Sequence, residues 1–367
     1  MPNPITHPLA DAVDLGSIGR VLVVKLRHHG DVLLTSPVFS VLKRHAPHLE
    51  LDALVYRDTR EMLTLHPAIT NVFTIDRAWK RETAWTRLGH EWRLLRQLRA
   101  RGYDLLIHLT ESYRGAMLAQ WLAPRVRVAQ RYGARRGRFW HGSFTHVFPI
   151  PAKPRHRVEL HLDALRRIGI YPTPEERRLT LVPGADAEDS VDELLRQSGL
   201  AHGKFIHLHP TSRWLFKCWE VDKYAALITA LQSAGERVVL TAAPAEHELQ
   251  FVRAILASAR APVVDLAGGL SLKQLAALTA RAKCFVGVDS VPMHIAAAMG
   301  TPTVALFGPS GDLEWGPWQV RARVVTTTHS CRPCGMDGCA GSKVSDCLVE
   351  IPVSQVLDAV RSLIAAA

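Results

Sequence analysis

The sequence predicts an α/β protein made of two Rossmann-like domains that face each other across a cleft. Three observations lead to this prediction. Short runs rich in Val, Leu and Ile alternate with helical patterns, which is typical of parallel sheets with crossover helices. Prolines at 149, 151, 154, 172 and 174 then interrupt the alternation near the middle of the chain. A second alternating series follows, and 367 residues are enough for two ordinary domains.

The first series of apolar runs defines the N-terminal domain. Its predicted strands are residues 21–26, 51–56, 71–75, 103–109 and 125–129. A helical segment at 158–168 lies among the linker prolines. We therefore expect the first domain to cover residues 1–172.

The second series defines the C-terminal domain, expected over residues 173–350. Its predicted strands are 178–183, 204–210, 237–242, 263–268, 284–289 and 302–309, and its predicted helices are 222–235, 246–259, 271–282 and 291–300. Residues 351–367 carry apolar side chains near helical spacing. We expect this last helix to pack back on the N-terminal domain.

The charge balance predicts an anionic partner. Lys and Arg number 45 against 34 for Asp and Glu, a formal net charge of +11, and residues 77–101 and 125–138 are especially basic. Nucleic acid, an anionic membrane surface and a phosphorylated substrate all fit, and so does a merely solvated surface. A nucleic-acid-binding protein is disfavoured, because the chain shows no recognition module or aromatic-basic repeat.

Two further features of the chain bear on its location. No apolar stretch reaches the roughly 18 to 20 residues of a membrane helix. The N-terminus has neither the basic start nor the apolar core of a signal peptide. We therefore expect a cytoplasmic protein.

The familiar nucleotide-binding motifs are absent. The turn after residues 21–26 has one glycine, Gly30, and lacks the Gly-x-Gly-x-x-Gly of dinucleotide sites. The sequence also contains neither a phosphate loop nor an Asp-x-Asp pair that could hold a divalent metal. If a nucleotide binds, protein groups must neutralise its charge, and we expect no metal and no cofactor.

Two loops of the second domain offer such groups. Thr211, Ser212 and Lys217 follow the strand at 204–210, where hydroxyls and an ammonium suit a diphosphate. An incidental surface loop is an equally good explanation of this feature alone. Asp289 and Ser290 follow the strand at 284–289 and precede a helix whose N-terminus can bind an anion.

Structural explanations compete with binding at the second loop. Asp289 or Ser290 could act only as a helix N-cap, and His294, one turn into the helix, could be structural. Two such loops at strand ends of one domain nevertheless favour a nucleotide cleft.

Asp31 in the first domain allows two interpretations. It lies after the first predicted strand and before a helical pattern at 32–42, so spacing alone favours an N-cap. Alternatively it is a general base, and Gly30 beside it permits close backbone approach of a substrate.

Four of the six cysteines lie close together, at 331, 334, 339 and 347. Their Cys-x₂-Cys-x₄-Cys-x₇-Cys spacing is compatible with a small structural zinc loop, although it matches no standard finger. Reduced thiols are favoured over zinc, and disulfides are least expected in a cytoplasmic chain.

Three segments together resemble the lipopolysaccharide heptosyltransferases, glycosyltransferase family 9 of the GT-B fold. They are VLVVKLRHHGDVLLTSPVFSVLK, HLHPTSRWLFKCWE and GVDSVPMHIAAAMGTPTVALFGPS. The resemblance spans nearly the whole chain. The HHGDVLLTSPV form and the cysteine segment look most like the heptosyltransferase III subtype, which adds the branching third heptose of the inner core.

The resemblance implies a reaction and its participants. ADP-heptose would be the donor and a heptose of the lipid A core oligosaccharide the acceptor, with inversion and without metal. Transfer of another sugar on the same fold remains the main alternative. The lipid-anchored acceptor implies peripheral association with the inner face of the cytoplasmic membrane.

The resemblance also assigns roles. Asp31 would be the catalytic base, and the donor would contact Thr211, Ser212, Lys217, Asp289, Ser290 and His294. The assignment of Lys217 is the less direct, because residues 214–216 lengthen its loop. Location and charge suggest the following acceptor-binding residues: His28, His29, Arg77, Lys80, Arg81, Arg114, Arg135 and Arg136.

Overall fold

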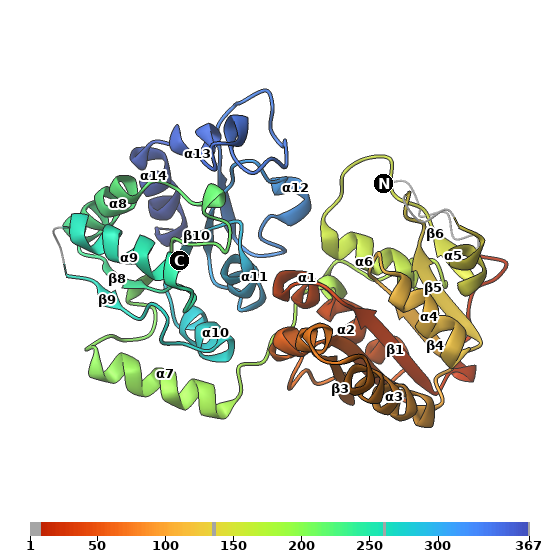
Figure 1. The fold of residues 1–367 in the computed structure, drawn as a ribbon. Helices are drawn as coiled ribbons and strands as arrows, with labels where there is room; N and C mark the ends of the chain where they lie inside the picture. Colours follow the sequence, from red (N-terminus) through yellow and green to blue (C-terminus); the bar gives the residue numbers. More distant parts are fainter. Residues whose placement is uncertain (1–8, 134–136, 260–261, 366–367) are drawn as a thin grey trace. The chain divides into compact units, whose positions relative to one another are not determined.

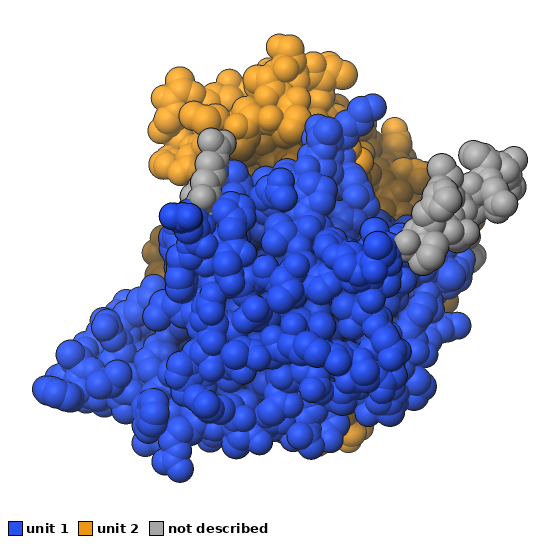
Figure 2. All heavy atoms as spheres, turned by 90° about the vertical axis from the view of Figure 1, so that its right-hand side faces the viewer, with its two compact units in different colours: residues 1–180 blue, residues 181–367 orange. Residues whose placement is uncertain are grey.

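A computed structural model describes residues 9–133, 137–259 and 262–365. The chain divides into two compact units, residues 1–180 and 181–367, which Figure 2 colours separately. The expected boundary at 172/173 lies in the same linker region. Within the part of the chain that the structure describes, no helix is both long and apolar enough to cross a membrane.

Unit 1 contains a six-stranded parallel sheet (Figure 1). Its strands are β1 (Arg20–Lys25), β2 (Glu50–Tyr56), β3 (Asn71–Ile75), β4 (Leu105–His108), β5 (Val126–Gln130) and β6 (His146–Phe148). The strand order is β3-β2-β1-β4-β5-β6. The order reverses between β1 and β4, which is the place where ligands bind in open α/β sheets.

Helices and helical turns precede, connect and follow these strands. They are η1 (Leu15–Ser17), α1 (His29–Leu33), α2 (Ser36–His45), η2 (Arg57–Met62), η3 (Arg77–Arg81), α3 (Ala84–Arg101), α4 (Tyr113–Leu122), α5 (Arg138–Ser143), α6 (Arg157–Arg166) and η4 (Glu175–Arg177). β1 is buried from Val21 to Lys25, as expected of a central parallel strand. Its alternate residues Leu22 and Val24 share a core with Leu94 and Leu98 of α3.

Unit 2 contains a second six-stranded parallel sheet, in the order β12-β11-β10-β7-β8-β9. Its strands are β7 (Phe205–His209), β8 (Arg237–Leu240), β9 (Val264–Asp265), β10 (Cys284–Val288), β11 (Thr303–Leu306) and β12 (Ala322–Val325). Here the order reverses between β7 and β10. Each unit therefore carries its own switch point at the carboxyl ends of two central strands.

The helices of unit 2 cover both faces of its sheet. They are α7 (Ala185–Gln197), η5 (Leu215–Lys217), α8 (Val221–Ser233), α9 (Glu246–Ser258), α10 (Leu272–Ala280), α11 (Val291–Ala298), α12 (Asp312–Trp315), η6 (Cys339–Gly341), α13 (Asp346–Val349) and α14 (Val353–Ile364). In β10, Cys284 and Val286 pack with α8, α9 and α14, whereas Phe285 packs with Met293 of α11. The period of two along the strand produces this division.

The structure adds to the expected elements and corrects one of them. Val356, Val360 and Leu363 of α14 belong to the core that α8 and the strands of unit 2 form. Its apolar stripe was recognisable, but the sequence did not indicate which core would bury it. Residues 178–183 form no strand, and the short strands β6 and β12 were not expected.

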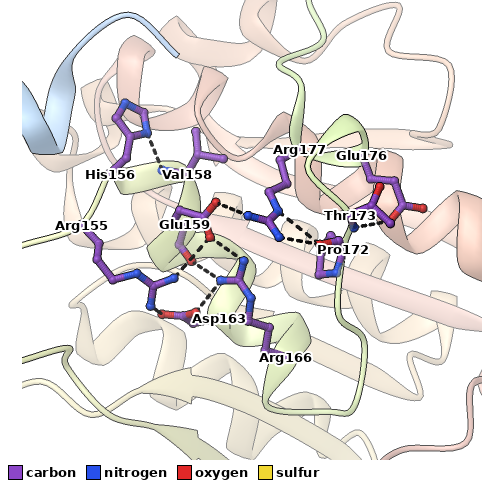
Figure 3. Close-up of polar contacts among 10 residues, drawn as sticks. All are labelled: Arg155, His156, Val158, Glu159, Asp163, Arg166, Pro172, Thr173, Glu176 and Arg177. Atoms are coloured by element: carbon purple, nitrogen blue, oxygen red, sulfur yellow. Dashed lines mark hydrogen bonds and ion pairs between the residues drawn. The ribbon is translucent and has the colours of Figure 1, made fainter. Parts of the chain in front are cut away.

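Ion pairs fix the linker region onto α6 (Figure 3). Glu159 accepts hydrogen bonds from Arg155, Arg166 and Arg177, which lie on three sides of its carboxylate. Arg177 also donates to the carbonyl of Pro172 at 2.8 Å. The proline-rich segment therefore ends unit 1 as an ordered part of it.

Candidate active site

Asp31 lies in the first turn of α1, at the carboxyl end of β1. The helix begins at His29 and its N-cap residue is His28, so Asp31 is inside the helix. The N-cap interpretation of Asp31 is therefore wrong. The expected helix at 32–42 is also divided, because α1 ends at Leu33 and α2 begins at Ser36.

The buried Lys25, the last residue of β1, holds Asp31 in place. Its ammonium lies 3.6 Å from Oδ1 of Asp31 and donates to the carbonyl of Leu109 at 3.0 Å. It is also 2.9 Å from Nε2 of His161 on α6. Nδ1 of His161 donates to the carbonyl of Leu34 at 3.0 Å, because a carbonyl can only accept. The imidazole is therefore the Nδ1–H tautomer, and its Nε2 accepts from Lys25.

Burial sets the protonation states of this cluster. It lowers the pKa of Lys25 from 10.5 to about 8, and the charge of Asp31 opposes that fall. Burial, and then the charge of Lys25, hold the pKa of His161 well below its usual range. At neutral pH the lysine of this cluster is therefore cationic and the histidine is neutral. The ammonium of Lys25 fixes the orientation of the Asp31 carboxyl group.

Several of the suggested acceptor-binding residues lie around this edge of the sheet. Arg77 donates to Oδ2 of Asp58 at 2.6 Å and to the carbonyl of Arg27 at 2.9 Å. Nε2 of His29 lies 2.8 Å from the carbonyl of Asp58, so the structure gathers His29 and Arg77 around Asp58. His28 immediately precedes α1 and is exposed.

The remaining basic candidates are more dispersed. Lys80 and Arg81 are exposed at the end of η3. Arg114, in the first turn of α4, is ion-paired with Glu91 of α3, and its burial lowers its pKa. Arg135 and Arg136 lie outside the described residues.

In unit 2 the loops after β7 and β10 meet through one ion pair. Lys217, at the end of η5, donates to Oδ2 of Asp289 at 2.7 Å. Thr211 and Ser212, directly after β7, are buried. The structure thus brings together the two predicted donor loops, because β7 and β10 are neighbours in the sheet.

The N-terminus of α11 lies beside this pair. Ser290 is its N-cap residue but makes no side-chain capping bond, and its hydroxyl donates to the carbonyl of Val288 at 3.4 Å. The cap interpretation is therefore not supported for Ser290. His294, one turn into α11, is buried, with its ring 6.5 Å from that of Trp315.

A buried polar network supports the β7 loop from below. Nε2 of His209 is 3.4 Å from the hydroxyl of Thr211, and its Nδ1 is 2.8 Å from the hydroxyl of Thr241. Thr241 also lies 2.7 Å from Nε2 of His207. Burial lowers the pKa of His209 to about 3, so the network is uncharged at neutral pH. It fixes Thr211 without adding charge to the site.

Comparison with known proteins identifies the family. Residues 91–344 match glycosyltransferase family 9 (heptosyltransferase). Lipopolysaccharide heptosyltransferase 3 of Escherichia coli is 36% identical over 294 residues, which cover 80% of this chain and 84% of that protein. The chain belongs to glycosyltransferase family 9. The heptosyltransferase resemblance of the sequence is thereby confirmed.

Solved structures of this family share its fold. The family 9 glycosyl transferase of Veillonella parvula has a TM-score of 0.83 at 22% identity, covering 98% of this chain and 100% of that one. The Escherichia coli ADP-heptose lipopolysaccharide heptosyltransferase II has a TM-score of 0.73 at 22% identity, covering 95% and 99%. The two-sheet α/β architecture predicted from the sequence is therefore that of the GT-B glycosyltransferases.

The cysteine segment of this heptosyltransferase contacts the loop after β7, since the hydroxyl of Ser345 donates to the carbonyl of Phe216 at 2.6 Å. All six cysteines are free thiols, and Cys347 is buried whereas Cys331 and Cys334 are exposed. Among the described residues no group of three or more His, Cys, Asp or Glu side chains is arranged to hold a metal ion. The zinc-loop hypothesis gains no support from this arrangement.

Sequence reasoning missed two residues of this glycosyltransferase, Lys25 and His161. A charged residue closing an apolar strand was a signal for Lys25, since a buried lysine requires partners. His161 gave no local signal, because it reaches Lys25 from a helix 136 residues later in the chain.

Proposed function

We propose that this glycosyltransferase transfers L-glycero-D-manno-heptose from ADP-heptose to a heptose of the lipopolysaccharide inner core. The observation that carries the proposal is Asp31, a carboxylate held by the buried ammonium of Lys25 at the switch point of unit 1. The identity to Escherichia coli lipopolysaccharide heptosyltransferase 3 supports the choice of sugar and acceptor. The heptosyltransferase III subtype is therefore the one we propose.

Asp31 acts as the general base of the proposed reaction. It accepts the proton of the acceptor hydroxyl while that oxygen forms a bond to the anomeric carbon and the bond to the ADP oxygen breaks. Attack opposite to the leaving group inverts the configuration. Lys25 orients the carboxylate, so Asp31 needs only hydrogen-bond reach to the hydroxyl.

The loops of unit 2 stabilise the departing diphosphate. Lys217 supplies the positive charge, Thr211 and Ser212 supply hydroxyl donors, and α11 supplies the N–H groups of its first turn next to Ser290. These groups replace a metal ion in the proposed mechanism. The solved Escherichia coli heptosyltransferase WaaC contains ADP, which supports an adenine nucleotide here. His294 lies close enough along α11 to contribute to the same site.

The acceptor meets unit 1 at the edge that carries His29 and Arg77. Phosphates of the lipid A core are recognised by guanidinium groups, which bind phosphate oxygens in pairs. Because Asp58 already fixes Arg77, its charge is oriented before the acceptor arrives. His28, Lys80, Arg81 and Arg114 are the further candidates for acceptor binding in the proposal. The acceptor lipid would keep the enzyme at the inner face of the cytoplasmic membrane.

Mass spectrometry of the product tests the reaction. The enzyme is incubated with ADP-heptose and truncated core acceptors, and a mass increase of one heptose on one acceptor is expected. Asp31→Asn should retain the fold and ADP binding while turnover falls by roughly 10²-fold or more. Asp11→Asn is the matched control, because Asp11 is an exposed carboxylate of the same unit that is paired with Arg167. Wild-type turnover of Asp31→Asn would exclude the base role.

Two further measurements test the donor and the metal. ADP should inhibit transfer far better than UDP, and the reverse would indicate another sugar nucleotide. Turnover should be unchanged in excess EDTA. Loss of turnover that Mg²⁺ restores would refute the metal-independent mechanism.

A further inference from the structure

The helix α3 exposes an apolar face that the packing of unit 1 does not use. Of its 18 residues only Leu94 and Leu98 are buried. On the opposite side Trp85, Leu88 and Trp92 are 84%, 59% and 55% exposed. Their spacing of three and four residues places them on one stripe of the helix. Thr83 caps the helix start, so this stripe is part of an ordered element.

The neighbouring helix α4 continues the apolar surface. Tyr113 and Met117 are 42% and 61% exposed, and Trp121 follows on the same face one turn later. The ring of Trp121 meets that of Trp92 edge-on at 6.4 Å between centroids. The exposed side chains of α3 and α4 therefore form one surface, which we call the α3–α4 patch.

Arginines surround the apolar part of the α3–α4 patch. Arg87, Arg93, Arg96 and Arg99 are all exposed on α3. The guanidinium of Arg99 lies over the Trp121 ring, 5.2 Å from its centroid. An open hollow on this helix is lined by Trp92 together with Arg93, Arg96 and Arg99. The α3–α4 patch therefore combines exposed apolar side chains with a cluster of guanidinium groups.

We propose that the α3–α4 patch docks unit 1 on an anionic phospholipid bilayer. Tryptophan rings favour the interface between head groups and acyl chains, and arginines beside them bind lipid phosphates. A second copy of the chain fits this surface poorly, because a symmetric contact would place arginines against arginines. An ordinary protein interface is also depleted of charge at its core.

The position of α3 connects this surface to the proposed function. The helix starts three residues after the end of η3, which follows the carboxyl end of β3. Its first turns, with Trp85 and Leu88, therefore lie toward the edge of the sheet that carries Asp31. This part of the inference rests on the proposed lipid-anchored acceptor. Docking there would present the acceptor half-site to sugars that project from the bilayer.

Co-sedimentation with vesicles tests the docking itself. The full chain should bind vesicles of phosphatidylethanolamine and phosphatidylglycerol, bind phosphatidylcholine vesicles much less, and dissociate in high salt. Arg93→Ala with Arg96→Ala should weaken binding by roughly 30-fold. Trp85→Ser with Leu88→Ser should weaken it at least about tenfold. The matched control is Leu313→Ser, since Leu313 of α12 is 65% exposed and lies in unit 2.

Three outcomes would overturn the proposal. They are equal vesicle binding by all variants, equal wild-type binding to both vesicle types, and an arginine-dependent affinity for single-stranded oligonucleotide without vesicle binding. Self-association that the serine variants abolish, with no vesicle binding, would assign the patch to a second copy.

A transfer assay separates this proposal from the proposed function. The patch variants should match the wild type on a deacylated, water-soluble acceptor and show a raised KM only on acceptor embedded in vesicles. If the wild type transfers heptose to neither acceptor, the proposed function fails while the vesicle result still stands. If transfer occurs and vesicle-bound acceptor gives equal KM values for all variants, the docking surface fails alone.

Discussion

Replacing Lys25 by methionine tests whether the cluster behind Asp31 matters for the reaction. Methionine has a similar length but no charge, so Asp31 loses its cation and the carbonyl of Leu109 and Nε2 of His161 lose a donor. A carboxylate displaced by about 1 Å from its productive position loses roughly 10²-fold in rate. We therefore expect kcat to fall by about that factor, with a much smaller change in KM for ADP-heptose.

Lys25 affects the free energy of unfolding and the activity in opposite directions as pH increases. Burial lowers the pKa of Lys25 from 10.5 to about 8, which corresponds to roughly 3 kcal/mol. Between these two values the unfolded chain binds more protons at this residue than the folded chain. The contribution of Lys25 to the free energy of unfolding therefore rises as pH increases from 8 to 10.5. Activity should fall over the start of this range, since the neutral amine no longer holds Asp31.

Steady-state kinetics and urea unfolding, both measured across pH 8, distinguish these effects. Above pH 8 the wild-type kcat should fall, whereas the urea midpoint should increase because of Lys25. The Lys25→Met variant should have a low kcat at every pH and lose both pH dependences. Its free energy of unfolding at neutral pH should differ from that of the wild type by no more than about 3 kcal/mol. Lys43→Met is the control, because Lys43 donates to the carbonyl of Leu49, away from Asp31. A Lys25→Met enzyme with wild-type kcat and an unchanged alkaline limb would refute the reasoning.

Further predictions concern the donor loops and the cores. Lys217→Ala should raise the Kd for ADP by roughly 10- to 100-fold in calorimetry, because a charge-assisted bond to phosphate is lost; an unchanged Kd would exclude its diphosphate role. Gly115→Ala should lower the free energy of unfolding by at least about 2 kcal/mol, since its Cβ would lie 1.9 Å from the His108 ring. Gly142→Ala, with open space around it, should be nearly neutral by the same urea titration. The pKa values of His108 and His209 are lowered to about 4 and about 3, so stability should fall as pH decreases from 6.5 to 4; a flat urea midpoint there would contradict their neutral state.

The sequence predicted the fold well where its signals were local. Apolar runs such as β1 and β10 are buried on both faces, and this produces an unambiguous strand pattern in a parallel sheet. Short edge strands such as β6 and β12 have no such pattern, because an edge strand pairs on one side only. The sequence also could not predict which core buries α14, since an amphipathic stripe indicates that a helix face is buried but not against which elements.

The candidate site was predictable in composition but not in its pairings. The rule that ligands bind at the carboxyl ends of central strands located Asp31, Lys217 and Asp289. The pairing of Lys217 with Asp289 required knowing that β7 and β10 are neighbours. Predicting the Asp31 cluster would have required knowing that α6 lies beside the end of β1, because His161 and Lys25 are far apart in sequence.

The two ion pairs at the switch points show how burial separates a supporting residue from a reacting one. In unit 1 the side chain of Lys25 is 8% exposed and that of Asp31 is 17% exposed. In unit 2 the ammonium is the more exposed member of the pair: the side chain of Lys217 is 24% exposed and that of Asp289 is 10% exposed. The more exposed member is the carboxylate where the proposed chemistry needs a base and the ammonium where it needs a cation. In the proposed mechanism Asp289 orients Lys217 toward a diphosphate, as Lys25 orients Asp31 toward a hydroxyl. The buried partner supplies the opposite charge in each case, and this ion pair fixes the exposed group before either substrate binds.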